Sequence, residues 1–139
     1  MKRLVITITL LITLVGSVFA TDKRTKKFEE GVYICKRIAK DYNVDVEITK
    51  ASALPNRAIS VCMKKDEKFV IKLNWNYYEK ASPDEIIPGI IHEMGHAVTD
   101  NCGHDQRWIN AIFDIVDYFP NLNYCEAYNV NNISIYLDK

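Results

Sequence analysis

The sequence has no excess of charge of either sign and few of the residues that mark linkers. Its 139 residues carry 18 Lys and Arg against 18 Asp and Glu, and only five are glycine and four are proline. A neutral chain offers no basic face for nucleic acid. No internal repeat or Gly/Ser-rich segment follows residue 20. These absences favour one globular domain over a repeat protein, a two-domain chain or a nucleic-acid-binding module.

The one long apolar run stands at the N-terminus and has the layout of a secretory signal peptide. Lys2-Arg3 provides a basic start, an apolar segment follows, and Val18 and Ala20 fit the −3 and −1 positions of a cleavage site. The apolar segment is shorter than the roughly 20 residues of a membrane-spanning helix. We therefore expect cleavage of residues 1–20, no stable membrane insertion, and an exported chain over 21–139, secreted or periplasmic/extracellular.

Cysteine is scarce, but its number is even. In an exported chain of this size, four cysteines predict two disulfides. The absence of a C-x-x-C motif argues against a cysteine-type zinc site. Among the three possible connectivities we favour Cys35–Cys62 together with Cys102–Cys125.

Hydrophobic periodicity predicts an α+β chain. Apolar residues recur at three- and four-residue steps in the helical segments and alternate with polar residues in the strands. Ser82 and Pro83 mark a helix start, and Pro88 predicts that this helix either kinks or begins again there. The expected elements are a helix over 26–42, a strand over 44–48, a hairpin over 59–73, a helix over 82–100, a helix over 108–119 and a short strand over 133–137.

The predicted hairpin has two sets of alternating apolar residues. We expect the first set to face the second across a four-residue loop over 64–67. The first set is Ile59, Val61 and Met63, and the second is Phe69, Ile71 and Leu73.

The motif H-E-x-x-H lies within the predicted helix over 82–100. It consists of His92, Glu93 and His96. A spacing of four residues is slightly more than one helical turn, so both imidazoles project from one face and can bind one metal ion, with Glu93 beside them. The alternative is a pair of core or surface histidines without a metal. We favour the metal site because apolar residues flank the motif on both sides.

A catalytic zinc ion needs three protein ligands and one open position. The third histidine of the chain, His104, follows Gly103, and a glycine there would allow a sharp reversal back toward the helix. Glu126, Asp100 and Asp105 are the acidic alternatives for the third ligand. We favour His104 because that assignment uses every histidine in the chain.

Together these residues resemble the SprT/Spartan-type minimal zincins. The resemblance rests on the H-E-x-x-H segment over 90–97, then Gly103-His104-Asp105, then Trp108, and the order of elements is similar over 28–119. It implies a minimal zincin fold with a leading helix, a three-stranded sheet, a metal helix and a following helix. It also implies that His92, His96 and His104 bind zinc, that Glu93 is the catalytic base and that Trp108 packs beneath the site.

The sequence departs from the intracellular members of that family. It has an export signal, four cysteines and no net positive charge, and it lacks the C-x-x-C zinc ribbon that such members often carry. We therefore expect a peptide or protein substrate and no nucleic acid.

The expected function is a secreted zinc metallopeptidase with one Zn²⁺ per chain, in which Glu93 is the general base for a zinc-activated water. The alternative is a catalytically inactive zinc-binding or host-interaction module on the same scaffold. Asn132 begins an N-glycosylation triplet. The residues that could stabilise an oxyanion, by type, are Tyr77, Tyr78, Arg107, Tyr118, Tyr124 and Tyr128.

Overall fold

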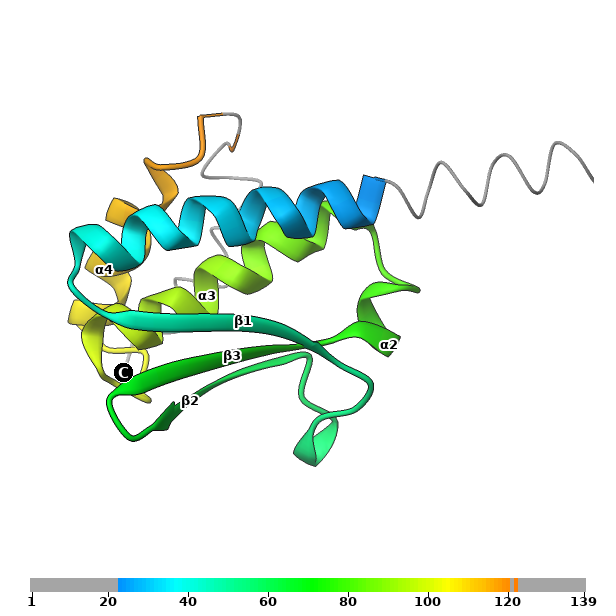
Figure 1. Cartoon of the computed structure of the whole chain (residues 1–139), viewed down its shortest axis with the longest axis horizontal. Helices are drawn as coiled ribbons and strands as arrows, with labels where there is room; N and C mark the ends of the chain where they lie inside the picture. Colours follow the sequence, from blue (N-terminus) through cyan, green and yellow to red (C-terminus); the bar gives the residue numbers. More distant parts are fainter. Residues whose placement is uncertain (1–22, 121, 123–139) are drawn as a thin grey trace, which may run out of the picture.

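The computed structural model describes residues 23–120 and residue 122, and it confirms the α+β class (Figure 1). The predicted signal peptide, Cys125, Glu126, Asn132 and the strand over 133–137 lie outside the described residues. The described elements are a leading helix over 23–41, β1 (Asp45–Ala51), a 3-10 helix (Pro55–Arg57), β2 (Ser60–Lys65), β3 (Lys68–Asn74), α2 (Trp75–Tyr78), a second 3-10 helix (Pro83–Glu85), α3 (Ile86–Thr99) and α4 (Gln106–Val116).

The sheet has three strands in the order β1-β3-β2. β1 runs parallel to β3, whereas β2 pairs antiparallel with β3 through a two-residue turn. The central strand β3 therefore carries the most buried side chains of the sheet, including Ile71 and Leu73. β2 is left as an edge strand.

The leading helix and α3 lie on the same side of the sheet (Figure 1). Their close approach depends on Gly31, because a Cβ atom there would lie 2.5 Å from Ile90 Cδ1 of α3. A shared core lies between these helices, β3 and α4. Its fully buried residues include Cys35, Ile38, Ile71, Leu73, Tyr78, Ile86, Ile90, Ile91, Met94, Trp108, Ile112 and Ile115.

The start of α3 accommodates Pro88 without a kink inside the helix. The Ser82 hydroxyl accepts a hydrogen bond from Asp84 N–H and caps the short 3-10 helix. α3 then begins at Ile86, so Pro88 falls in its first turn, where a backbone N–H has no partner within the helix. The two predicted alternatives were a kink and a new start at Pro88. The structure shows a new start, which lies at Ile86, two residues before the proline.

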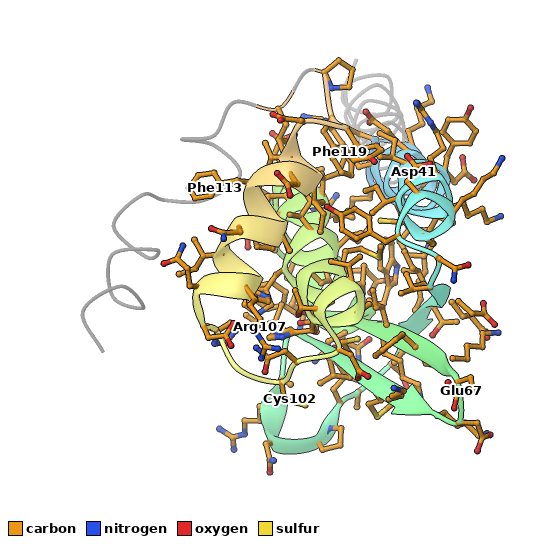
Figure 2. The ribbon with its side chains drawn as sticks, turned by 90° about the vertical axis from the view of Figure 1, so that its left-hand side faces the viewer. Asp41, Glu67, Cys102, Arg107, Phe113 and Phe119 are labelled. Carbon is orange, nitrogen blue, oxygen red and sulfur yellow. The ribbon has the colours of Figure 1, made fainter. Side chains whose placement is uncertain are left out.

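A carboxylate fixes the start of α4. Asp105 Oδ1 accepts hydrogen bonds from the backbone N–H groups of Arg107 and Trp108, at 3.0 and 3.1 Å. Just beyond the end of α4, the Tyr118 hydroxyl donates to Asp41 Oδ2 at 2.8 Å. This bond ties α4 to the end of the leading helix, where Figure 2 labels Asp41.

The predicted faces of the hairpin are wrong by one residue on β2. Residues directly opposite each other share a face of the sheet, and the register is Ser60↔Leu73, Cys62↔Ile71 and Lys64↔Phe69. Ile59 and Met63 therefore lie on the outer face, 44% and 43% exposed. The prediction placed the apolar residues of β2 on the inner face. That face instead carries Ser60, Cys62 and Lys64, because β2 is an edge strand and its inner face borders the polar cleft described below. The turn is also shorter than predicted, because only 66–67 lie between the strands.

The predicted Cys35–Cys62 disulfide is not formed, because both residues are free thiols. Cys35 is buried on the leading helix. Cys62 lies on β2, the edge strand on the opposite side of the sheet from β1. Cys102 is also a free thiol, so the predicted pairing with Cys125, which lies outside the described residues, is not formed either. Within the described part of the chain, no helix is long and apolar enough to cross a membrane.

Candidate metal centre

Three imidazoles converge at one end of α3. His92 and His96 lie one turn apart, with their Nε2 atoms 3.4 Å apart, and His104 Nε2 lies 3.1 Å from His92 Nε2. One ring nitrogen from each residue lies within 4.8 Å of the other two. Nitrogens on a tetrahedral zinc ion with bonds of about 2.0–2.1 Å are about 3.3 Å apart. The cluster can therefore hold a metal ion.

The reversal that returns His104 to the helix occurs at Asp100, not at Gly103. Asp100 adopts a left-handed conformation with φ of 46°, and no described glycine has a positive φ. Asn101 N–H then donates to the His96 carbonyl at 3.3 Å, and Asn101 Oδ1 accepts from Gly103 N–H at 3.0 Å. These bonds satisfy groups at the end of the helix and hold the loop that carries His104.

One hydrogen bond orients the His96 ring. The ring nitrogen Nδ1 lies 2.7 Å from the Asn101 carbonyl oxygen, to which it can only donate. This bond leaves Nε2 of His96 unprotonated and directed at the other two histidines. A backbone carbonyl on the second ring nitrogen is the usual arrangement for a metal-binding histidine.

Trp108 of α4 forms the floor of the cluster. Its ring centroid lies 4.9 Å from that of His92, 5.6 Å from that of His96 and 4.5 Å from that of His104. The indole N–H also donates to the His92 carbonyl at 3.3 Å. The prediction that Trp108 packs against the site is therefore confirmed.

The helices α3 and α4 can approach this closely because Gly95 has no side chain. A Cβ atom at Gly95 would lie 2.7 Å from Trp108 Nε1 and 2.6 Å from Ile112 Cδ1. The glycine of H-E-x-x-H thus has a packing role, which brings the indole beneath the imidazoles.

His92 and His104 are held in their neutral form. Burial, followed by the nearby His96 and His104, lowers the pKa of His92 to about 3. Burial and His96 also lower the pKa of His104. Neutral imidazole is the form that binds a metal, so these rings need not lose a proton near pH 7 to do so.

Glu93 is the one buried charged residue within the described ranges, with 5% of its surface exposed. Its carboxylate accepts a hydrogen bond from the Ser60 hydroxyl at 2.6 Å, and the backbone N–H of Cys62 lies nearby on the same strand. Burial raises the pKa of Glu93, whereas the Ser60 hydroxyl, His96 and the Cys62 N–H lower it. The edge strand β2 thus stabilises this buried carboxylate.

The cluster opens into a cavity of about 300 Å³ between β2, α3 and the loop that follows α3. Figure 2 shows Cys102 on this loop, before α4 begins near Arg107. An ion pair of 2.5 Å between Lys64 and Asp100 joins β2 to the end of α3 at the cavity wall. The lining residues are Ser60, Val61, Cys62, Lys64, Phe69, His92, Glu93, His96, Asp100, Asn101, Cys102 and His104.

The acidic alternatives for the third ligand have other partners where they are described. Asp100 pairs with Lys64, and Asp105 caps α4 while it also binds the guanidinium group of Arg107. Glu126 lies outside the described residues. Among the described residues, His104 is the one brought together with His92 and His96.

None of the described candidates for oxyanion stabilisation lines the cavity. The Tyr77 hydroxyl donates to Glu85 at 2.6 Å, Tyr118 binds Asp41, and Arg107 pairs with Asp105. Tyr78 is buried in the core. Tyr124 and Tyr128 lie outside the described residues.

Sequence reasoning missed Ser60. The available signal was a small polar residue between Ile59 and Val61 in an alternating strand, which is naturally interpreted as facing solvent. Only the register of β2 shows that Ser60 faces inward.

Comparison of the chain with protein-family models, curated proteins and solved structures finds no match.

Proposed function

We propose that the chain is an exported zinc-dependent peptidase of the SprT/Spartan-like minimal zincin type, with one zinc ion per chain. The observation that carries the proposal is that three convergent imidazoles and one buried carboxylate line the same open cavity. His92, His96 and His104 would hold the ion. The remaining coordination position would be open, as catalytic zinc requires.

When bound, zinc would act as a Lewis acid, which polarises a carbonyl group and lowers the pKa of water. Glu93 takes a proton from the attacking water and passes it to the leaving amine. Its carboxylate stays fixed during this exchange because Ser60 holds it against β2. The cavity is open along an edge strand, which suits an extended peptide or protein segment.

The alternative is an inactive zinc-binding module. It is favoured by the absence of a Tyr or Arg side chain from the described cavity lining, where an oxyanion would need a donor. The burial of Glu93 argues against it, since burying a carboxylate is unfavourable and a structural zinc site has no need of one.

The variant Glu93→Gln tests the proposal. The amide keeps the shape of the side chain but cannot accept a proton, so we expect full zinc content and a kcat/KM for peptide cleavage about 100- to 10,000-fold lower, which is roughly 3 to 5 kcal/mol. The measurements are elemental analysis and cleavage of a mixed peptide library by the mature protein, with and without chelator.

His96→Ala is the contrasting variant, and it should lose zinc and activity together. Cleavage by Glu93→Gln at the rate of the parent would refute the enzyme proposal. A parent protein without chelator-sensitive cleavage would refute it equally, and the zinc-binding module would then be the better account.

A further inference from the structure

The Ser60 hydroxyl lies between two other side chains. It donates to Glu93 Oε1 at 2.6 Å, a length typical of a hydroxyl bound to a charged carboxylate. Burial raises the pKa of Tyr78 and the nearby Ser60 hydroxyl lowers it, so Ser60 lies beside Tyr78 as well. A serine hydroxyl has one proton. Because that proton is given to Glu93, Ser60 acts as the donor to the carboxylate.

Tyr78 is held beside Ser60 by the core. It is 1% exposed, and its hydroxyl reaches α3 at Gly89, where a Cβ atom would lie 2.0 Å from Oη. Gly89 and Glu93 are four residues apart and therefore share one face of α3. The missing side chain at Gly89 leaves room for the tyrosine hydroxyl one turn before the carboxylate.

The backbone around Tyr78 is fixed in turn by the leading helix. Arg24 Nε donates to the Tyr78 carbonyl at 3.0 Å, and Arg24 Nη2 donates to the Ala81 carbonyl at 2.8 Å. The segment from Tyr78 to Ala81 therefore cannot move away from the leading helix without breaking two bonds to a charged donor.

We infer that Ser60 is a positioning residue, which holds Oε1 of Glu93 against β2 and so leaves Oε2 to exchange the proton during peptide hydrolysis. The inference rests on the proposed peptidase function.

The first test is Ser60→Ala. We expect kcat to fall about 10- to 100-fold, the effect of one hydrogen bond to a charged group, with KM and zinc content unchanged. Ser60→Thr keeps the hydroxyl and suits a strand, so it should restore kcat to within a few-fold of the parent. A kcat for Ser60→Ala within twofold of the parent, or an equal loss in Ser60→Thr, would overturn the inference.

The second test uses two neighbouring tyrosines. Tyr78→Phe removes the hydroxyl beside Ser60 but leaves the bond from Ser60 to Glu93, so it should lower kcat much less than Ser60→Ala does. Tyr77→Phe removes a hydroxyl that binds the exposed Glu85, and it should leave kcat unchanged. A loss of kcat in either tyrosine variant as large as that in Ser60→Ala would contradict the specific role of Ser60.

A third measurement does not depend on activity. In metal-free protein with ¹³C-labelled glutamate carboxyl groups, the Glu93 resonance should shift in Ser60→Ala and return in Ser60→Thr. An unchanged resonance would refute the anchoring. If the anchoring is observed but the parent cleaves no peptide, the peptidase proposal fails while the contact itself stands.

Discussion

At the scale of the residue, His104 determines whether the site has two ligands or three. His92 and His96 share a helix face by their spacing alone, but His104 reaches them only through the left-handed Asp100 and the loop that follows. Its imidazole ring packs against the indole of Trp108, with the two ring centroids 4.5 Å apart.

We expect His104→Ala to weaken zinc binding by at least about 100-fold, since even the partners that orient a ligand are worth 10- to 100-fold. The matched control is Asp105→Asn, which removes the neighbouring carboxylate but keeps a side chain able to cap α4. Zinc titration monitored with a competing chelator indicator measures both. If His104→Ala binds zinc as tightly as the parent, the third ligand must be Glu126 or another acidic residue.

The roles of site residues could be predicted from the sequence where those residues lie within one helical turn of each other. H-E-x-x-H predicted that His92 and His96 share a face, because a helix sets that geometry within one turn. Ser60 was not identified as a partner of Glu93, because its approach depends on the register of β2, which no periodicity in the sequence encodes.

At the scale of the element, the contact between α3 and α4 builds the floor of the site. Gly95 is the point of closest approach, and Trp108 and Ile112 fill the space that a side chain would occupy. Stability and the arrangement of the three imidazoles above Trp108 therefore depend on the same glycine.

We expect Gly95→Ala to lower the free energy of unfolding by about 2 kcal/mol. Overpacking costs about 1–3 kcal/mol, and a helical alanine recovers up to about 1 kcal/mol of it. Urea denaturation of the metal-free protein gives this value. Gly103→Ala is the control and should change it by less than about 0.5 kcal/mol, because the nearest atom to its Cβ would be 3.5 Å away. Equal stabilities of the two variants would refute the packing role of Gly95.

Elements with strong periodicity or caps were predicted close to their observed bounds. The leading helix, α3 and α4 carry apolar stripes, and Ser82 marked the approach to α3. The helix α2 was missed because four residues carry no measurable period. The inner face of β2 was assigned wrongly because the period of a strand does not tell which of its two faces is buried, and one residue of register exchanges them.

At the scale of the whole molecule, a bound metal would link α3 to the loop that leads into α4. An ion that binds the folded chain in preference to the unfolded chain stabilises the fold by mass action. The fold should therefore respond to zinc even where no substrate is present.

Zinc at a free concentration of about 100 times its dissociation constant should add about 2.7 kcal/mol, which raises the Tm of a domain of this size by about 10 °C or more. Chelator should reverse this shift. Differential scanning calorimetry measures it, and His96→Ala should show the same Tm with zinc and with chelator. An identical Tm for the parent in both conditions would exclude a metal at the three histidines.

The distribution of the site along the chain has a consequence for folding order. The three histidines lie within residues 92–104, whereas Ser60 and Glu93 are 33 positions apart and on different elements. Contacts close in sequence form with little loss of chain entropy, and distant contacts must wait for loop closure. If the proposed site takes zinc, a folding chain would be able to hold the ion as soon as α3 and its loop form. It acquires an oriented Glu93 only when β2 has docked on α3, so ion capture would precede hydrolytic competence.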